Sequence, residues 1–355
     1  MKTFLITCLL LLAASVQAAE LPNPDPADFI IRNFRFASGE TLPEVRIHYH
    51  TYGTPRRDAQ GVVRNAVLIL HSTASDGEYL LNNLKFVGEL FGKGQPLDAT
   101  RYYLIIPDNI GHGKSTKPSD GLRARFPRYC YRDMVEAQYR LVTEGLKVNH
   151  LRLVMGTSMG GMHTWLWGEK YPAFMDALLP LASLPIQISG RNRMWRKMVS
   201  DMIRSDPEWR GGDYEKQPLS LRFANEIFFF MLGNPLERQK EGATLKQADE
   251  FFRQQIDAMA AKRDANDILY SVESSQDYDP NPDLEKIRAP LLAVNFIDDL
   301  INPPELGILE REIKRVKNGR AVIIPLSEES IGHRTYAKPS VWKRHLERFL
   351  KETGR

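Results

Sequence analysis

The stretch from Leu151 to Gly161, LRLVMGTSMGG, contains a serine between glycines directly after a short apolar run. A Gly-x-Ser-x-Gly pattern between a strand and a helix is typical of a sharp turn that lifts a serine hydroxyl clear of a sheet. Here a strand is predicted over residues 151–155 and a helix over residues 160–170. We therefore predict that Ser158 is the nucleophile of an acyl-transfer reaction.

On both sides of this turn, short apolar runs alternate with helical stretches. Nearly continuous apolar runs are expected of parallel strands that are covered on both faces. The alternation predicts an α/β fold with a mostly parallel sheet and helices on both faces. The predicted strands are residues 45–52, 66–70, 102–107, 151–155, 177–181, 291–296 and 321–325, and the clearest helices are residues 131–147 and 160–170.

Residues 185–285 interrupt the alternation, because no buried strand is predicted there and the stretch is rich in Arg, Met and aromatic residues. We expect this segment to form a helical cap inserted over the site, with residues 19–184 and 286–355 as the two parts of the α/β core. The alternative is a packed helical subdomain without a functional role. A homodimer formed through the cap is a further expectation. The predicted cap helices are residues 193–204, 219–232 and 245–262.

Residues 1–18 have the pattern of a cleavable signal peptide. Lys2 precedes an apolar run over residues 4–14, and Val16-Gln17-Ala18 is a small-x-small cleavage site. The run is shorter than the about 20 residues that a membrane-spanning helix needs, so we expect no stable membrane span after cleavage. A periplasmic or secreted protein is expected, and an uncleaved membrane anchor is the alternative. The Pro-rich residues 21–26 are predicted to link the cleavage site to the fold.

The composition excludes several classes of partner. The chain has 355 residues, 43% of them hydrophobic, and its net charge of +4 comes from charges of both signs mixed along the chain. Without a basic block, no nucleic-acid partner is expected. Cleavage of residues 1–18 removes Cys8 and leaves Cys130, so no intramolecular disulfide is predicted.

Two short patterns suggest other chemistries, but each lacks a residue that the chemistry requires. Residues 111–115 end in Gly-Lys-Ser, yet Asp108 stands where a phosphate-binding loop needs its first glycine. His48 and His50 share one face of a predicted strand, but no third metal ligand is suitably spaced. We therefore expect neither a metal nor a cofactor, and the expected ligand is a small-molecule ester or another acyl donor.

The base that activates Ser158 is predicted to be His333. In this arrangement the acid and then the histidine follow the serine along the chain. His333 comes after the predicted strand 321–325, and the carboxyl ends of parallel strands meet at one edge of the sheet. His333 would take the proton of Ser158 and later return it to the leaving group.

The acid that orients His333 is predicted to be Asp299. Asp298 and Asp299 both follow the predicted strand 291–296. Asp299 is preferred because Pro303 stands four positions later, and Asp298 is the alternative. The carboxylate would hold the imidazole in the required tautomer and stabilise its charged form.

Attack on a carbonyl creates an oxyanion, which needs preorganised donors that contribute about 3–4 kcal/mol each. One predicted donor is the backbone N–H of Met159, directly after the nucleophile. The second is predicted in the loop after the strand 66–70, at the backbone of Thr73, with Ser72 as the alternative.

The chain resembles the homoserine O-acetyltransferase group of α/β-hydrolases over nearly its whole length after residue 18. This resemblance implies an α/β-hydrolase fold, an acyl-enzyme on Ser158 and a helical cap that forms a tunnel to it, and it supports Thr73 and Met159 as oxyanion donors. The matching pieces are Tyr52-Gly53, Asn65 to Leu68, Tyr131 to Val135, Ala137-Gln138, Ser158 to Met162, Asp206-Pro207, Trp209, Gly211 to Tyr214, Asp299, Pro303-Pro304 and Gly332-His333.

This chain differs from the group at positions that are expected to contact the substrate. The group follows its catalytic histidine with an aspartate suited to an ammonium group, and this chain has Arg334, which should repel an amine. The resemblance suggests that a carboxylate-binding cap arginine corresponds to Arg222 and that a nearby tyrosine is replaced by Phe229. All three residues are therefore candidates for substrate binding. Export also separates the protein from cytoplasmic acetyl-CoA.

The sequence therefore predicts an exported serine hydrolase that cleaves a small carboxylic ester or a thioester. The alternative is an O-acyltransferase that passes the acyl group from Ser158 to an alcohol. A non-catalytic binding protein on the same fold is the third hypothesis.

Overall fold

The computed structural model describes residues 23–354, so the predicted signal peptide lies outside the described residues. Eight strands form one sheet in the order β1-β2-β4-β3-β5-β6-β7-β8. The first three of these pair antiparallel, and from β4 onward every neighbouring pair is parallel. The strands are β1 (Asp25–Arg35), β2 (Thr41–Tyr52), β3 (Ala66–Leu70), β4 (Tyr103–Pro107), β5 (Leu153–Thr157), β6 (Leu178–Leu181), β7 (Leu291–Phe296) and β8 (Gly319–Ile324).

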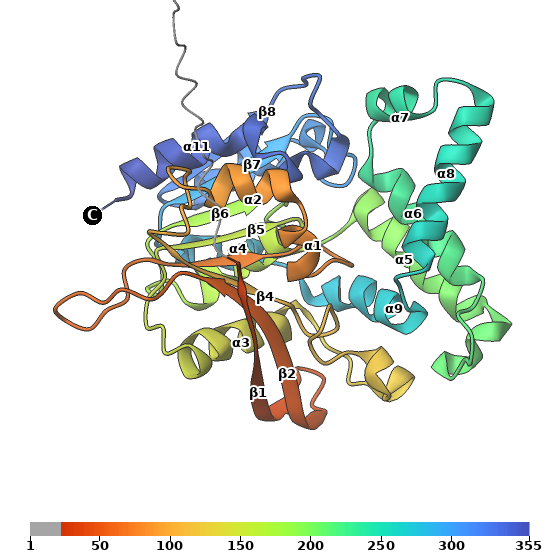
Figure 1. The fold of residues 1–355 in the computed structure, drawn as a ribbon, viewed down its shortest axis with the longest axis horizontal. Coiled ribbons are helices and arrows are strands. Elements are labelled where there is room, and N and C mark those ends of the chain that lie inside the picture. Colours follow the sequence, from red (N-terminus) through yellow and green to blue (C-terminus); the bar gives the residue numbers. More distant parts are fainter. Residues whose placement is uncertain (1–22, 355) are drawn as a thin grey trace, which may run out of the picture.

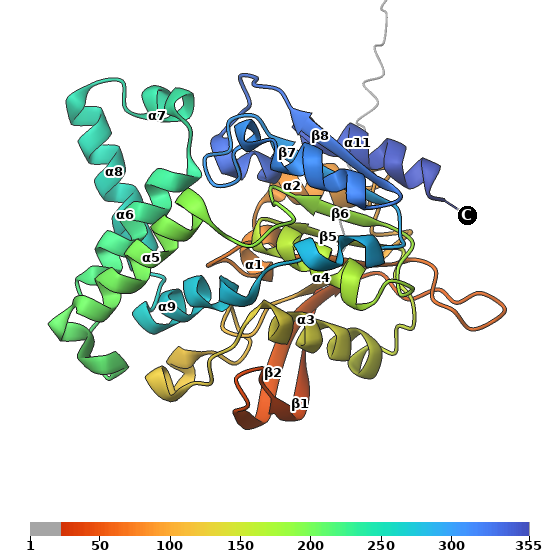
Figure 2. The same cartoon turned by 180° about the vertical axis from the view of Figure 1, so that it is seen from behind.

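Helices cover both faces of the sheet, as Figures 1 and 2 show from opposite sides. Helices α2 and α11 lie over one face, and α3 and α4 lie over the other. The α-helices are α1 (Gly77–Leu81), α2 (Leu84–Phe91), α3 (Tyr131–Arg140), α4 (Met159–Lys170), α5 (Gly190–Ser205), α6 (Ser220–Leu232), α7 (Pro235–Glu241), α8 (Leu245–Ala260), α9 (Ala265–Glu273), α10 (Ile308–Glu312) and α11 (Pro339–Glu352).

The central strands are buried on both sides because alternate residues of a strand point to opposite faces. In β5, Leu153 and Met155 join the hydrophobic core beneath α2 and α11, whereas Val154 joins the core beneath α3 and α4. All five residues of β5 are buried. This explains why the strand reads as a continuous apolar run in the sequence.

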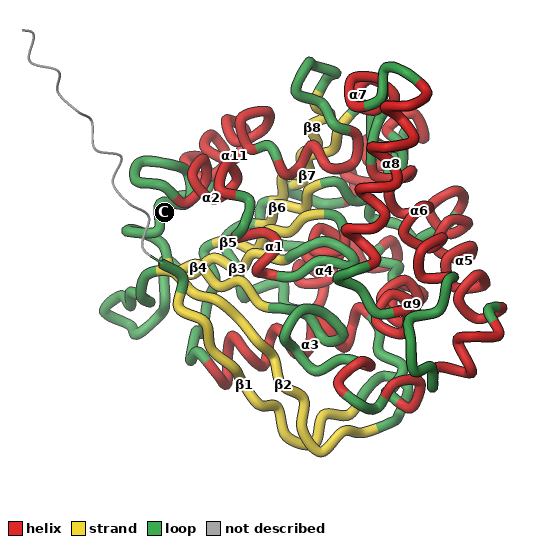
Figure 3. Tube along the Cα trace, turned by 45° about the vertical axis from the view of Figure 1, so that its right-hand side comes forward, coloured by secondary structure: helices red, strands yellow, loops and turns green. Residues whose placement is uncertain are grey.

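The segment between β6 and β7 consists of helices α5 to α9, which stand together at one end of the sheet (Figure 3). They have a hydrophobic core of their own, which includes Trp195, Phe228 and Leu269. Ile301, from the loop after β7, belongs to the same core and so attaches the helices to the sheet edge. In the described part of the chain, no helix is long and apolar enough to span a bilayer.

Three sequence predictions need correction. Residues 25 and 26 belong to strand β1 rather than to a linker, because Asp25 to Arg35 pair with β2 as an antiparallel edge strand. Strand β5 begins at Leu153, two residues later than predicted, because Leu151 makes only an isolated bridge with Met175. The helix predicted over residues 131–147 ends as an α-helix at Arg140 and continues as one π-helical turn.

Candidate active site

Ser158 lies at the turn between β5 and α4 in a strained backbone conformation. Its φ is 55° and its ψ is −112°, a region that side-chain-bearing residues seldom occupy. Glycines make the turn sterically feasible. A Cβ on Gly156 would lie 2.1 Å from the carbonyl oxygen of Gly160, and a Cβ on Gly160 would lie 2.2 Å from that of Leu70.

Backbone hydrogen bonds hold the strained residue. The Ser158 N–H donates to the Leu181 carbonyl at 2.9 Å, and the Ser158 carbonyl accepts from the N–H of Met162 at 2.9 Å. Strand β6 and helix α4 therefore anchor the serine from both sides. The turn is held by the tightly packed sheet, which can balance a backbone strain of this size.

The structure brings Ser158, His333 and Asp299 together in one chain of hydrogen bonds. His333 Nε2 lies 2.8 Å from Ser158 Oγ, and His333 Nδ1 lies 2.8 Å from Asp299 Oδ2. The three residues are 5%, 1% and 1% exposed, in the same order. This order of nucleophile, imidazole and carboxylate can transfer a proton from the serine during attack on a carbonyl.

Asp299 is fixed by the loop that follows β7. Its Oδ1 accepts the backbone N–H groups of Ile301 at 2.8 Å and Asn302 at 2.9 Å, which leaves Oδ2 for His333. The Asn302 side chain in turn donates to the carbonyl of Ala182, after β6. The carboxylate is therefore held in one orientation by neighbours on two strands.

Asp298, the alternative acid, contacts a different part of the site. Its Oδ2 accepts the backbone N–H of Gly332 at 2.8 Å and a hydrogen bond of 2.5 Å from Asn234 Nδ2. Asn234 also donates to the Ser330 carbonyl. Asp298 thus ties the segment before α7 to the loop that carries His333, a connection that residue spacing did not predict.

The two predicted oxyanion donors leave adjacent parallel strands at the same edge. The register pairs Leu70 of β3 with Gly156 of β5, so Thr73 and Met159 both lie just beyond the paired ends. Met159 is the first residue of α4, where backbone N–H groups have no partner within the helix. In residues 23–354 the Thr73 and Met159 N–H groups make no hydrogen bond. They are therefore available to an oxyanion.

Other histidines near the turn have structural surroundings. His163 and His112 are fully buried, and burial lowers the pKa of both, that of His112 to about 3. His163 Nδ1 lies 3.1 Å from the Gln138 amide, and His112 Nε2 lies 3.0 Å from the Ser271 hydroxyl of α9. Neither imidazole forms a hydrogen bond to Ser158.

The three residues predicted to bind substrate are engaged elsewhere. Arg222 makes ion pairs with Asp257 and Glu226. Phe229 packs against the aromatic rings of α8, with ring centroids 5.7 to 5.9 Å apart. Arg334 makes an ion pair of 2.6 Å with Glu237 of α7, so its charge is largely compensated. Within residues 23–354 none of the three makes a hydrogen bond or ring contact with Ser158, His333 or Asp299.

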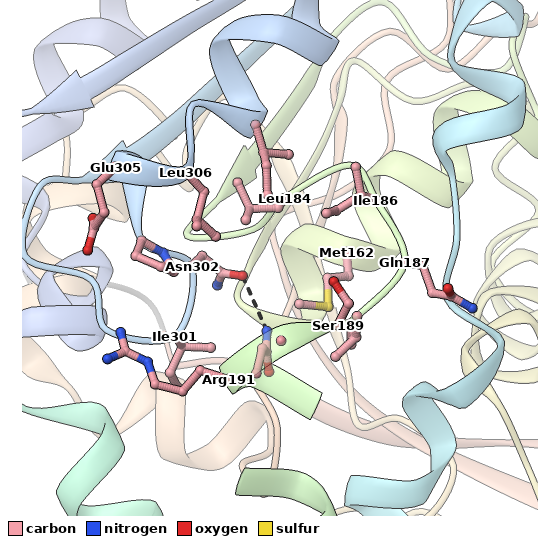
Figure 4. Close-up of a pocket in the computed structure, with 15 residues that line it drawn as sticks. Met162, Leu184, Ile186, Gln187, Ser189, Arg191, Ile301, Asn302, Glu305 and Leu306 are labelled. Atoms are coloured by element: carbon pink, nitrogen blue, oxygen red, sulfur yellow. Dashed lines mark hydrogen bonds between the residues drawn. The ribbon is translucent and has the colours of Figure 1, made fainter. Parts of the chain in front are cut away.

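A cavity of about 520 Å³ lies beside the loop that carries the acid, as Figure 4 shows. Its lining is mainly apolar and includes Met162, one turn beyond the serine in α4, and Ile301 and Asn302, which follow Asp299. Asn192 of α5 also lines it, and its Nδ2 lies 3.4 Å from Asn302 Oδ1. The lining includes neither Ser158 nor His333, so this cavity adjoins the candidate site without containing its reactive atoms.

Comparisons with known sequences agree with this fold. The family model described as the alpha/beta hydrolase fold matches residues 65–311. A homoserine O-acetyltransferase of Pelobacter propionicus is 30% identical over 335 residues, which cover 84% of this chain and 88% of that protein. A probable acyltransferase of Methanothermobacter thermautotrophicus is 29% identical over 282 residues, which cover 79% of this chain and 85% of that protein.

Solved structures share the fold at lower sequence identity. Esterase E22 superposes with a TM-score of 0.80 at 21% identity, covering 92% of this chain and all of that one. The homoserine O-acetyltransferase of Bacillus anthracis has a TM-score of 0.79 at 22% identity, covering 93% and 98%. The family match, the relative at 30% identity and the shared fold show that this chain belongs to the α/β-hydrolase family, in its homoserine O-acetyltransferase-like group.

Proposed function

We propose that this protein is a serine-dependent acyltransferase that forms an acyl-enzyme on Ser158 and passes the acyl group to an alcohol. The observation that carries the proposal is the pair of 2.8 Å hydrogen bonds that joins Ser158 to His333 and His333 to Asp299. The relatives that cover most of the chain and are named for acyl transfer favour transfer over the hydrolysis that the sequence suggested first.

In the first half-reaction, Ser158 Oγ attacks the carbonyl carbon of an ester or thioester while His333 Nε2 takes the hydroxyl proton. The carbonyl oxygen becomes an oxyanion that the N–H groups of Thr73 and Met159 stabilise. The tetrahedral intermediate then breaks its bond to the leaving alcohol or thiol, which receives the proton from His333. The acyl group remains on Ser158.

In the second half-reaction, an acceptor alcohol attacks the acyl-enzyme and His333 takes its proton. Collapse of the second tetrahedral intermediate releases the new ester and returns the proton to Ser158. Asp299 holds the imidazole and stabilises its charged form in both halves. Neither step needs a metal or a redox cofactor to balance.

Hydrolysis is the second candidate function, in which water replaces the acceptor alcohol. Arg334 favours it, because the resemblance implies an aspartate at this position to hold an acceptor amine, and Arg334 is instead paired with Glu237 at 2.6 Å. An arginine paired in this way offers no anionic partner to an amine-bearing acceptor.

Intact-mass measurement across a short series of esters and thioesters separates the candidates, with Ser158→Ala as the control. Transfer predicts that the acyl mass on the wild-type protein decays when an alcohol is added and persists in water alone. Decay in water at an unchanged rate would favour hydrolysis. A wild-type protein that no donor labels would support the non-catalytic binding role.

We also propose that the protein is exported, on the strength of the signal-like pattern in residues 1–18. N-terminal sequencing of the protein recovered from the periplasm or the medium tests this. A mature chain that begins at Ala19 is expected, and an intact Met1 in the cytoplasmic fraction would contradict it.

A further inference from the structure

His71 follows strand β3, and both nitrogens of its ring contact backbone groups whose hydrogen-bonding roles are fixed. The residue is 1% exposed. Its Nδ1 lies 2.9 Å from the carbonyl oxygen of Ser72, which can only accept a hydrogen bond, and its Nε2 accepts the backbone N–H of Asn109 at 3.0 Å. The ring is therefore neutral and carries its proton on Nδ1.

Three buried side chains on other elements hold this arrangement: Trp167 of α4, Gln138 of α3 and Asn109 after β4. The indole N–H of Trp167 can only donate, and it bonds to Gln138 Oε1 at 2.7 Å. Gln138 Nε2 is thereby turned to Asn109 and donates to its Oδ1 at 2.5 Å. Asn109 Nδ2 then lies 3.0 Å from His71 Nε2. This polar chain has one direction, which the indole sets.

The Ser72 carbonyl belongs to the same peptide unit as the Thr73 N–H, one of the two proposed oxyanion donors. The C=O and N–H of a planar trans peptide point in opposite directions, so a contact that fixes one fixes the other. Thr73 and Ala74 form a turn, and Ala74 has a φ of 53°, which residues with a side chain seldom adopt. A strained turn of this kind depends on its surroundings to keep its conformation.

We propose that His71 is a positioning residue for the oxyanion donor, so that its Nδ1–H holds the Ser72 carbonyl and thereby aims the Thr73 N–H at the oxyanion. The polar chain keeps the ring in the tautomer that this contact needs. The inference rests on the proposed acyl transfer at Ser158. A carbonyl that accepts a hydrogen bond also polarises its peptide, which makes the Thr73 N–H a stronger donor.

The test uses two variants that divide the hydrogen-bonding functions of His71. In His71→Asn the amide nitrogen is attached to Cγ, as Nδ1 is, and can still donate to Ser72. In His71→Gln the amide lies one bond further out, near the place of Nε2, so the contact with Asn109 can persist while the donor to Ser72 is lost. Both variants are assayed with an activated acetyl ester and with its thionoester, in which sulfur replaces the carbonyl oxygen.

His71→Gln should lower kcat for the ester by about 10- to 100-fold with little change in KM, since loss of a whole oxyanion donor costs about 100- to 1,000-fold. Sulfur accepts hydrogen bonds poorly, so kcat for the thionoester should fall by less than about threefold. The ratio of the two rates therefore falls in His71→Gln, and His71→Asn should keep most of it.

His112→Asn is the matched control for this ratio. The His112 ring is also buried, and its Nδ1 also bonds to a backbone carbonyl, that of Ile110 at 3.0 Å. That carbonyl lies in the loop after β4 and not beside an oxyanion donor. His112→Asn should therefore leave the ratio of ester to thionoester unchanged.

Nitrogen NMR of the histidine side chains tests the inference in the unaltered protein. At pH 7 His71 should be neutral with its proton on Nδ1. Trp167→Phe removes the indole N–H that sets the direction of the polar chain, so a second tautomer of His71 should appear in that variant. An unchanged His71 signal in Trp167→Phe would contradict the role of the polar chain.

Two further results would overturn the inference. One is a His71→Gln protein in which ester and thionoester are slowed equally, and the other is a wild-type His71 that is charged or carries its proton on Nε2. If no ester acylates Ser158, the proposed function fails. The tautomer of His71 then still decides whether its ring holds the Ser72 carbonyl.

Discussion

Asp298 and Asp299 are neighbours in the chain, yet their carboxylates contact different parts of the candidate site. Asp299 Oδ2 orients the His333 ring at 2.8 Å, whereas Asp298 Oδ2 accepts the backbone N–H of Gly332, directly before that histidine, and the side chain of Asn234, directly before α7. One carboxylate therefore orients the imidazole of His333, the proposed base, and the other fixes the loop that carries His333 against the cap helices.

These separate contacts predict that the two isosteric substitutions affect kcat and stability differently. Asp299→Asn should lower kcat by about 10,000-fold, because the amide no longer stabilises the imidazolium and favours the wrong tautomer. Asp298→Asn should lower kcat by no more than about tenfold but reduce stability by about 1.5–3 kcal/mol, since two hydrogen bonds lose their charged acceptor. Ester turnover and thermal unfolding of both variants check this. Equal kcat losses would show that the roles are not separate.

The glycines of the turn predict a stability contrast. Gly160→Ala places a Cβ 2.2 Å from the Leu70 carbonyl oxygen in the centre of the sheet, so we expect several kcal/mol of destabilisation or an insoluble protein. Gly88→Ala in α2 is the matched control, because a Cβ there meets nothing within 4 Å. It should stabilise the protein by about 0.5–1 kcal/mol. Chemical denaturation measures both, and a fully stable Gly160→Ala protein would refute the steric account.

His112 predicts a specific sensitivity to acid. Burial lowers its folded-state pKa to about 3 from an ordinary value near 6.5, so below pH 6.5 the unfolded chain binds a proton that the folded chain does not. The contribution of the neutral His112 to the free energy of unfolding is complete above pH 6.5, and it falls by about 1.4 kcal/mol per pH unit toward pH 3. When the pH falls from 6.5 to 5, the free energy of unfolding of His112→Asn should therefore decrease by about 2 kcal/mol less than that of the wild type. Parallel pH dependences in denaturant unfolding would contradict this.

Exposed apolar side chains on the cap predict self-association. Phe230 of α6 is 75% exposed, and Met194 and Met198 of α5 are 66% and 54% exposed. Large exposed apolar side chains that gather on one part of a surface mark interaction sites. We expect a dimer formed through these helices, which Phe230→Glu should dissociate. Leu84→Glu, at an 81% exposed position of α2, should not. Sedimentation analysis that finds a wild-type monomer would disprove the expectation.

The sequence predicted the sheet core and the residues of the turn because these depend on local patterns. Strands β3 and β7 were placed at their observed bounds, since fully buried parallel strands read as unbroken apolar runs. Strand β1 was missed because it is an edge strand whose exposed positions are mostly polar and whose first four residues are Asp-Pro-Ala-Asp. Edge strands carry a weaker apolar signal.

The surroundings of the turn could not be predicted because they depend on contacts between distant segments. No spacing rule links Asp298 to Asn234, which lies 64 residues earlier, or Arg334 to Glu237, 97 residues earlier. The resemblance suggested Arg222 as a candidate for substrate binding, and only the fold reveals that its side chain makes ion pairs with Asp257 and Glu226. Charge compensation is a property of tertiary structure.

The central claim is that Ser158 becomes covalently acylated and is deacylated through His333. The most direct measurement is the intact mass of wild type, Ser158→Ala and His333→Ala after brief exposure to an activated acetyl ester. We expect one added acetyl group on the wild type, located at Ser158 by peptide mapping. We expect none on Ser158→Ala and only slow labelling of His333→Ala. Equal acetylation of wild type and Ser158→Ala at another residue would contradict it.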